Sequence, residues 1–112
     1  MNDSIDPTLE IREAAAVLEN VVTGTSCNQS SFKTKKGSFL FIGPGPKGLG
    51  YKAMFKLRHS IDQAQKLAEE QPKRFEVGST GWVTARFTGV EPLPESIWSS
   101  WLQESYDITE SK

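Results

Sequence analysis

The residues with the most reactive side chains in this chain are one histidine, His59, and one cysteine, Cys27. Metal binding or acid–base catalysis by His59 would need partners, and the sequence has no His/Cys/Asp cluster at ligand spacing. Cys27 lies in a Ser/Asn/Gln stretch far from His59, which does not favour a nucleophilic pair, and a single cysteine excludes an intrachain disulfide. We therefore expect a protein that is not an enzyme and has no metal site and no cofactor.

A glycine-rich segment, Gly43-Pro-Gly-Pro-Lys-Gly48, matches the G-x-G-x-x-G pattern of dinucleotide-binding loops. That chemistry needs a helix directly after the glycines, so that backbone amides and the helix dipole face the pyrophosphate. Here two prolines remove amide donors and a strand pattern follows. Gly45 and Gly50 have the spacing of a phosphate loop, but Tyr51 stands where that loop needs lysine. The segment predicts a plain hairpin loop.

The formal net charge of −1 conceals three segments of different charge. Residues 33–86 hold eleven Lys or Arg against four Asp or Glu, a net charge of +7. Residues 1–32 and 87–112 each carry a net charge of −4. A basic middle between acidic ends indicates an anionic partner more than a neutral total would.

The length of 112 residues predicts a single domain over residues 1–112. The first residues lack the basic and apolar regions of a signal peptide. The longest apolar runs, such as Phe39-Leu-Phe-Ile42, are far shorter than the roughly 20 residues that span a bilayer. We expect a cytoplasmic protein without a membrane partner.

Periodicity and turn residues predict the elements that must position any site. Asp6-Pro7 opens a predicted helix over residues 7–22, which Gly24 follows as a stop signal. Strands are predicted over 32–36, 38–42, 51–57, 74–77 and 82–88. A helix begins at Ser60, where Gln63 completes a capping box, and the last helix follows Pro92-Leu-Pro94 and places Trp98 and Trp101 in the core. The predicted order is α-β-β-β-α-β-β-α, an α+β fold with an antiparallel sheet of about five strands and helices on one face.

Alternation along two predicted strands separates an apolar face from a basic one. Ala53 and Phe55 alternate with Lys52 and Lys56, and Val83, Ala85 and Phe87 alternate with Trp82 and Arg86. Positive charge around an exposed aromatic ring suits phosphate contact and base stacking, although lysines on an open sheet can also serve solubility alone. The candidate binding residues are Lys33, Lys35, Lys52, Lys56, Arg58, Arg74, Trp82 and Arg86.

Four segments of the chain resemble the MmcQ/YjbR family of small bacterial proteins. They are Lys36-Gly-Ser-Phe-Leu40, Tyr51-Lys-Ala-Met-Phe-Lys-Leu57, Gly81-Trp-Val-Thr-Ala-Arg-Phe87 and the ending Trp98-Ser-Ser-Trp-Leu-Gln-Glu-Ser-Tyr106. The resemblance covers roughly residues 32–108. It implies a frataxin-like (CyaY-like) two-layer α/β sandwich of the kind described as a DNA-binding double-wing fold. The Gly/Pro-rich loop 43–50 departs from the family pattern, so the resemblance does not determine which loops would act as wings.

We therefore expect a small binding module that contacts DNA without sequence readout through its basic sheet face. The alternative is a domain that binds an acidic protein or a small anion, or that associates with a second copy as a homodimer. In that alternative the acidic termini of one copy would cover the basic face of the other.

Overall fold

A computed structural model describes residues 6–26 and 28–111 of the chain. Six strands form one antiparallel sheet in the order β1-β2-β3-β4-β6-β5. The strands are β1 (Val22–Ser26), β2 (Gln29–Thr34), β3 (Gly37–Pro44), β4 (Tyr51–Lys56), β5 (Phe75–Val77) and β6 (Trp82–Phe87). The helices are α1 (Leu9–Ala16), α2 (Ile61–Glu70) and α3 (Glu95–Glu110), and a short 3-10 turn, η1, covers Pro46–Gly48.

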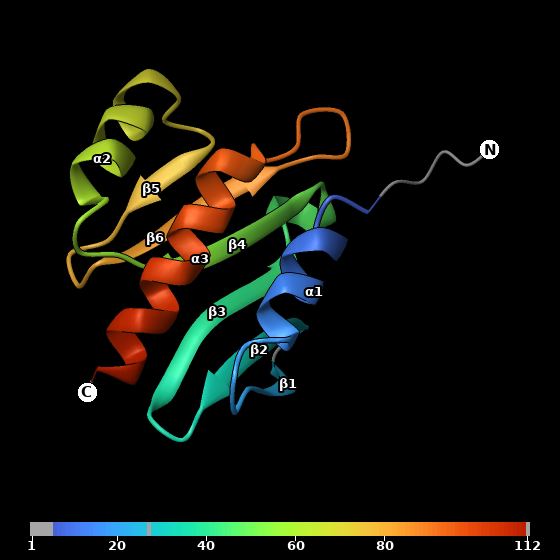
Figure 1. The fold of residues 1–112 in the computed structure, drawn as a ribbon. Coiled ribbons are helices and arrows are strands. Elements are labelled where there is room, and N and C mark those ends of the chain that lie inside the picture. The colour runs from blue at the N-terminus through green and yellow to red at the C-terminus, as the bar shows by residue number, and fades with distance from the viewer. Residues whose placement is uncertain (1–5, 27, 112) are drawn as a thin grey trace.

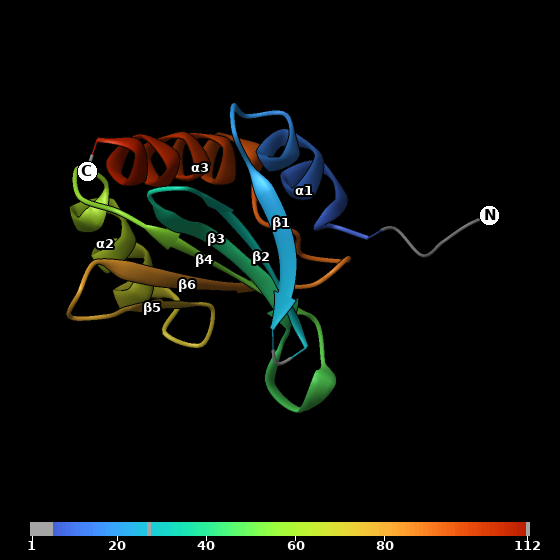
Figure 2. The ribbon, with the colours of Figure 1, turned by 90° about the horizontal axis from the view of Figure 1, so that it is seen from below.

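The helices α1 and α3 lie side by side on one face of the sheet (Figure 2). The third helix, α2, lies beside β5 at the end of the sheet (Figure 1). This arrangement confirms the predicted α+β class and the antiparallel sheet with helices on one face. The sheet has six strands where about five were predicted, because one strand lies inside a segment that the sequence assigned to a helix and a loop.

That additional strand is β1, and it shortens the first helix. The predicted helix 7–22 ends six residues early, at Ala16, and Val17 is 81% exposed. The chain reverses at Asn20, which has a φ of 63°, and Val22 then pairs with Lys33 of β2. Asn tolerates this left-handed conformation better than most residues, and the β-branched Val21 and Val22 suit a strand better than a helix. Gly24 is consequently a strand residue and not a helix stop.

The alternation predicted for β4 and β6 is confirmed. Ala53 and Phe55 are fully buried, as are their cross-strand partners Ala85 and Val83. On the same face, Trp101 of α3 is fully buried and contacts the rings of both Phe55 and Phe75, and Trp98 is 7% exposed. The predicted core positions of both tryptophans are therefore correct, and α3 is the main cover of the sheet.

The predicted capping box at the start of α2 is wrong. Ser60 stands at the N-cap position, but its hydroxyl donates a hydrogen bond to Glu104 of α3 and makes no cap bond within α2. The side chain of Gln63 accepts a hydrogen bond from the indole nitrogen of Trp101 at 3.0 Å and does not reach back to Ser60. The side chains of Ser60 and Gln63 are thus hydrogen-bonded to residues of α3, about 40 positions later in the sequence. Local spacing within α2 cannot predict such partners.

Three consecutive residues of α3 connect that helix to three other parts of the fold. The carboxylate of Glu104 accepts hydrogen bonds from the residues before α2. The hydroxyl of Ser105 donates to the Phe39 carbonyl of β3 and accepts from the Lys56 amide of β4. Tyr106 donates its hydroxyl to the Glu19 carbonyl between α1 and β1 and packs its ring edge against Phe39. The sequence Glu104-Ser-Tyr106 therefore has a structural explanation in the packing of α3.

The glycine-rich loop is the connection of the β3–β4 hairpin, as predicted. Pro44 pairs with Tyr51, and Gly45 donates its amide to the carbonyl of Gly50 at 3.0 Å. Gly50 has a φ of 68°, and a Cβ there would lie 2.8 Å from the Phe87 carbonyl oxygen. A side chain at residue 50 would therefore strain the hairpin. Within the described residues, no helix has the length and apolar character needed to cross a membrane.

Candidate functional site

One face of the sheet carries neither α1 nor α3, and the strand register determines which side chains it presents. Each residue of β4 that points away from these helices lies opposite a residue of β6 that does the same. Their side chains are half-buried, in contrast to the fully buried residues between them. We call the open face the surface formed by Phe41 of β3, Lys52, Met54 and Lys56 of β4, Trp82, Thr84 and Arg86 of β6, and Glu76 of β5.

An aromatic pair lies in the middle of the open face. The ring centroids of Phe41 and Trp82 are 5.4 Å apart with an interplanar angle of 54°. The two rings come from β3 and β6, which flank β4, so they meet over the strand between them. Phe41 was not among the predicted site residues. Both Leu40 and Phe41 are apolar, so the sequence has no alternation in β3 from which to assign a face.

Lys56 and Trp82 form a second contact on the open face. The Lys56 ammonium lies 5.7 Å from the centroid of the Trp82 ring and donates a hydrogen bond to the Thr80 carbonyl at 2.6 Å. A cation at this distance over an indole face is attracted by the ring quadrupole. Positive charge and an aromatic ring are therefore held next to each other, as the sequence predicted.

Two arginines at the β5 end of the open face are held by neighbours. Arg86 forms an ion pair at 2.8 Å with Glu76, the acidic side chain of the open face. Arg74 immediately precedes β5, and its guanidinium donates to Gln71 and to the carbonyls of Arg86 and Glu91. These contacts restrict both side chains and leave the region with a net positive charge.

The eight predicted binding residues are not all brought together. Lys52, Lys56, Trp82 and Arg86 share the open face, and Lys33 lies on the same side of β2 because its neighbours Phe32 and Thr34 are buried. Lys35 lies in the turn between β2 and β3 and lines a pocket with Glu110. Arg58 lies beyond the end of β4 and lines a different pocket with Gln103 and Asp107 of α3. The sequence placed Arg58 on the same face as Lys56 by strand alternation, but β4 ends at Lys56 and the alternation ends with it.

The residues first considered for catalysis lie elsewhere. His59 is exposed before α2, and its backbone amide donates to Glu104 at 2.7 Å. Among the described residues, no three His, Cys, Asp or Glu side chains lie together so that they could hold a metal ion. Cys27 lies outside the described residues. No chemical step follows from these positions.

The Glu104 carboxylate is the most strongly hydrogen-bonded acid of this region. It accepts hydrogen bonds from the amides of Arg58, His59 and Ser60 and from the Ser60 hydroxyl. Burial raises the pKa of Glu104, but these hydrogen bonds outweigh it, and the pKa lies below its ordinary value of 4.5. The ionised carboxylate therefore stabilises the start of α2 at neutral pH.

Glu104→Gln is expected to lower the free energy of unfolding at pH 7 by about 1 kcal/mol, because the amide keeps the shape and loses the charge. A group whose pKa is lowered by folding contributes stability above its unfolded pKa, and this contribution is lost as the pH falls through the folded pKa. Urea unfolding of both proteins at several pH values should show their difference shrinking below about pH 4.5. The control is Glu69→Gln on the exposed side of α2; parallel curves for wild type and Glu104→Gln would contradict the prediction.

Comparison with protein-family models and with curated protein sequences found no match for this chain. The fold and the site define its class: an α+β protein with an antiparallel sheet, helices on one face, and a basic and aromatic surface on the other.

Proposed function

We propose that this protein binds nucleic acid without sequence readout, with a preference for single strands, through the open face. The observation that carries the proposal is the half-buried pair of Phe41 and Trp82, which has Lys52, Lys56 and Arg86 around it on a sheet face that α1 and α3 leave uncovered. Proteins that bind single strands combine aromatic rings, on which bases stack, with basic side chains along the backbone. This surface has both parts.

The chemistry of the open face favours the backbone and the flat faces of bases as ligands. None of its residues is Asn or Gln, the side chains that read adenine edges. In a duplex the base faces are stacked on each other, whereas an unpaired base can stack on Trp82. A pocket of about 200 Å³ beside the face is lined by Lys73, Arg74 and Arg86, together with Glu91, and it offers a place for a phosphate. These features support a single-stranded ligand over a duplex.

The resemblance to the MmcQ/YjbR family points to the same class of ligand, since that family is described as a DNA-binding fold. In the proposed role the protein would act in the cytoplasm. The β3–β4 hairpin, with Lys47 exposed near its tip, is the segment best suited to act as a wing. In this role the ammonium of Lys47 would contact a further phosphate at one end of the open face.

Intrinsic tryptophan fluorescence tests the proposal. Trp98 is 7% exposed and Trp101 is fully buried, so quenching by a bound strand reports mainly on Trp82. We expect oligo-dT to quench the fluorescence and an equally long duplex to quench it less. If about four phosphates are neutralised, the slope of log K against log salt concentration should be about −3. Absence of quenching by either ligand at low salt would contradict the proposal.

Trp82→Ala is expected to weaken binding of oligo-dT about tenfold, because one stacked base contributes roughly 1–3 kcal/mol. Binding is measured by anisotropy of a labelled strand, since the variant loses the fluorescent reporter. Trp82→Phe is the matched variant and should retain most of the affinity, because it keeps an aromatic face next to Phe41. Equal affinities of wild type and Trp82→Ala would mean that stacking on this ring has no part in binding.

The alternative ligand is a second copy of the chain. The acidic residues of α1 and α3, among them Glu13 and Asp107, lie on elements of the helix side of the sheet. A contact between that side and the open face of another copy would be head-to-tail, which forms chains unless the rotation closes. Light scattering at low and high salt distinguishes the two cases: a salt-sensitive polymer without binding of oligo-dT would favour self-association.

A further inference from the structure

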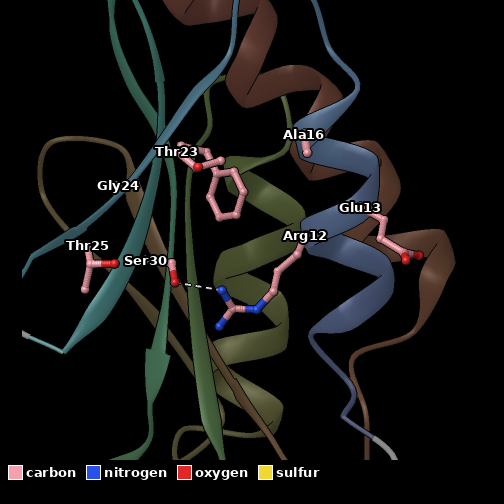
Figure 3. A pocket seen from close by; sticks show the side chains of 8 residues that line it. Arg12, Glu13, Ala16, Thr23, Gly24, Thr25 and Ser30 are labelled. Carbon is pink, nitrogen blue, oxygen red and sulfur yellow. Dashed lines mark hydrogen bonds between the residues drawn. The ribbon is translucent and has the colours of Figure 1, made fainter.

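A pocket of about 470 Å³ lies on the helix side of the sheet, between α1 and the β1–β2 hairpin. Its polar lining consists of the hydroxyl groups of Thr23, Thr25 and Ser30, with the charged residues Arg12 and Glu13 of α1. The side chains of Phe32 and Ala16 form the apolar part of the pocket wall. Figure 3 shows Arg12 reaching from α1 across the pocket toward Ser30. The volume is within the range of small-molecule sites.

Arg12 is held in this pocket by neutral groups. Its Nε donates to the hydroxyl of Thr8 at 2.9 Å, and its Nη1 donates to the hydroxyl of Ser30 at 2.7 Å. Thr8 is fully buried and donates its hydroxyl hydrogen bond to the Asp6 carboxylate, so that a lone pair of the Thr8 oxygen faces Arg12. The nearest acid in sequence, Glu13, points away from the guanidinium (Figure 3). Within the described residues, Arg12 forms no ion pair.

The hydrogen bonds of Arg12 leave donors available. A guanidinium has five N–H groups, and the bonds to Thr8 and Ser30 use two of them. The other three have no partner among the described residues. A planar guanidinium that is already oriented loses little conformational freedom when an oxyanion binds to its remaining donors.

A second pocket, of about 360 Å³, meets the first at Arg12 and Ser30. It is lined on its other side by the β3–β4 hairpin, including Ile42, Tyr51 and the backbone at Gly43. A Cβ on Gly43 would lie 2.8 Å from the Cβ of Gln29, so glycine keeps β2 and β3 close at this point. Arg12 therefore stands between two adjoining pockets, each with polar and apolar walls.

We infer that these pockets bind a small organic carboxylate, with its carboxylate group on Arg12 and its apolar part against Phe32 or Ile42. One fixed positive charge suits a monoanion better than a phosphate dianion, and the guanidinium fork matches the two oxygens of a carboxylate. The hydroxyl groups of Thr23, Thr25 and Ser30 provide further polar contacts along the walls. The site is separate from the open face, because α1 and β2 enclose it on the helix side of the sheet.

Titration of ¹⁵N-labelled protein with sodium benzoate, and separately with inorganic phosphate, tests the inference. Benzoate is expected to shift the amide signals of Arg12, Gly24 and Ser30 with a Kd of about 1 mM, and phosphate is expected to bind more weakly. Arg12→Gln should weaken benzoate binding about tenfold or more, whereas Glu13→Gln should not weaken it. Tighter binding of phosphate would assign the site to phosphorylated ligands and overturn the carboxylate assignment.

Two further results would overturn the inference completely. The first is the absence of shifts around Arg12 in wild-type protein at about ten times the expected Kd, an outcome that does not depend on any variant folding. The second is unchanged benzoate affinity in folded Arg12→Gln. Lys52→Glu/Lys56→Glu, which tests the open face, should bind benzoate like wild type. Failure of the nucleic-acid proposal therefore leaves this inference standing, and failure of this inference leaves that proposal standing.

Discussion

Lys52→Glu/Lys56→Glu is expected to weaken binding of oligo-dT by about a hundredfold or more at low salt. Both lysines lie half-buried on the open face. The Lys56 ammonium is 5.7 Å from the centroid of the Trp82 ring, the ring on which we expect a base to stack. Reversal replaces two attractive contacts with two repulsive ones and also changes the field that steers the strand to the surface. Lys52 makes no hydrogen bond or ion pair within the described residues, so its replacement should not disturb the fold.

The matched control for this double variant is Lys35→Glu/Lys66→Glu. Lys35 is exposed in the turn between β2 and β3 and Lys66 is exposed on α2, and neither belongs to the open face. Both double variants change the net charge by the same amount, so a general charge effect would weaken binding equally in each. A much larger loss in Lys52→Glu/Lys56→Glu, measured by anisotropy at constant salt, would locate the contact. Equal losses would contradict the assignment of the open face.

The central part of the fold was predictable because its information is local. In β4 and β6, buried apolar residues alternate with residues that are mostly polar, as in Ala53 and Phe55 between Lys52 and Lys56. Such alternation determines both the strand and its buried face, since a shift of one residue would bury lysine. The hairpin connection was predictable for a similar reason, because proline and glycine favour a turn, although β3 continues through Gly43 and Pro44 and a 3-10 turn covers Pro46–Gly48.

The N-terminal part was mispredicted because its structure depends on a distant partner. Residues 17–22 have an apolar composition that fits either a helix or a strand. The decision comes from pairing: Val22 lies opposite Lys33, and Tyr106 of α3 donates to the Glu19 carbonyl in the connection. Tyr106 lies far outside any window in which periodicity is read, whereas β2 follows β1 directly along the chain. Tertiary contacts therefore override a local helix signal here.

The predicted grouping of side chains on one sheet face holds for residues that lie on strands and fails for residues that lie beyond them. Lys56 is the last residue of β4, and two residues later the chain has turned toward α3, so Arg58 faces a different surface. Phe41 was missed for the opposite reason. It lies on a strand, but a bulge at Phe39 and apolar neighbours on both sides hide its orientation. The place of Phe41 beside Trp82 thus depends on the register of β3, which the structure provides.

Ser105→Ala is expected to lower the free energy of unfolding by about 3 kcal/mol, which makes it the largest stability effect among the substitutions proposed. The register of β2 and β3 shifts between Phe32 and Lys33, so Phe39 is an extra residue in β3 without a pairing partner on β2. The Ser105 hydroxyl donates to this carbonyl at 2.5 Å and accepts from the Lys56 amide at 2.8 Å. Ser105 is fully buried, so water cannot replace the lost bonds.

Ser99→Ala is the matched control, because Ser99 lies on the same helix, is exposed, and makes no hydrogen bond among the described residues. It should leave the unfolding midpoint nearly unchanged, since alanine favours a helix slightly more than serine. Ser105→Ala should lower the midpoint in urea without a change of slope, and hydrogen exchange of the Lys56 amide should accelerate more than that of its neighbours on β4. Similar midpoints for the two variants would show that another group satisfies Phe39 and Lys56. Because Lys56 belongs to the open face, a loosened Lys56 amide should also weaken binding of oligo-dT, which links the buried hydroxyl to the proposed binding surface.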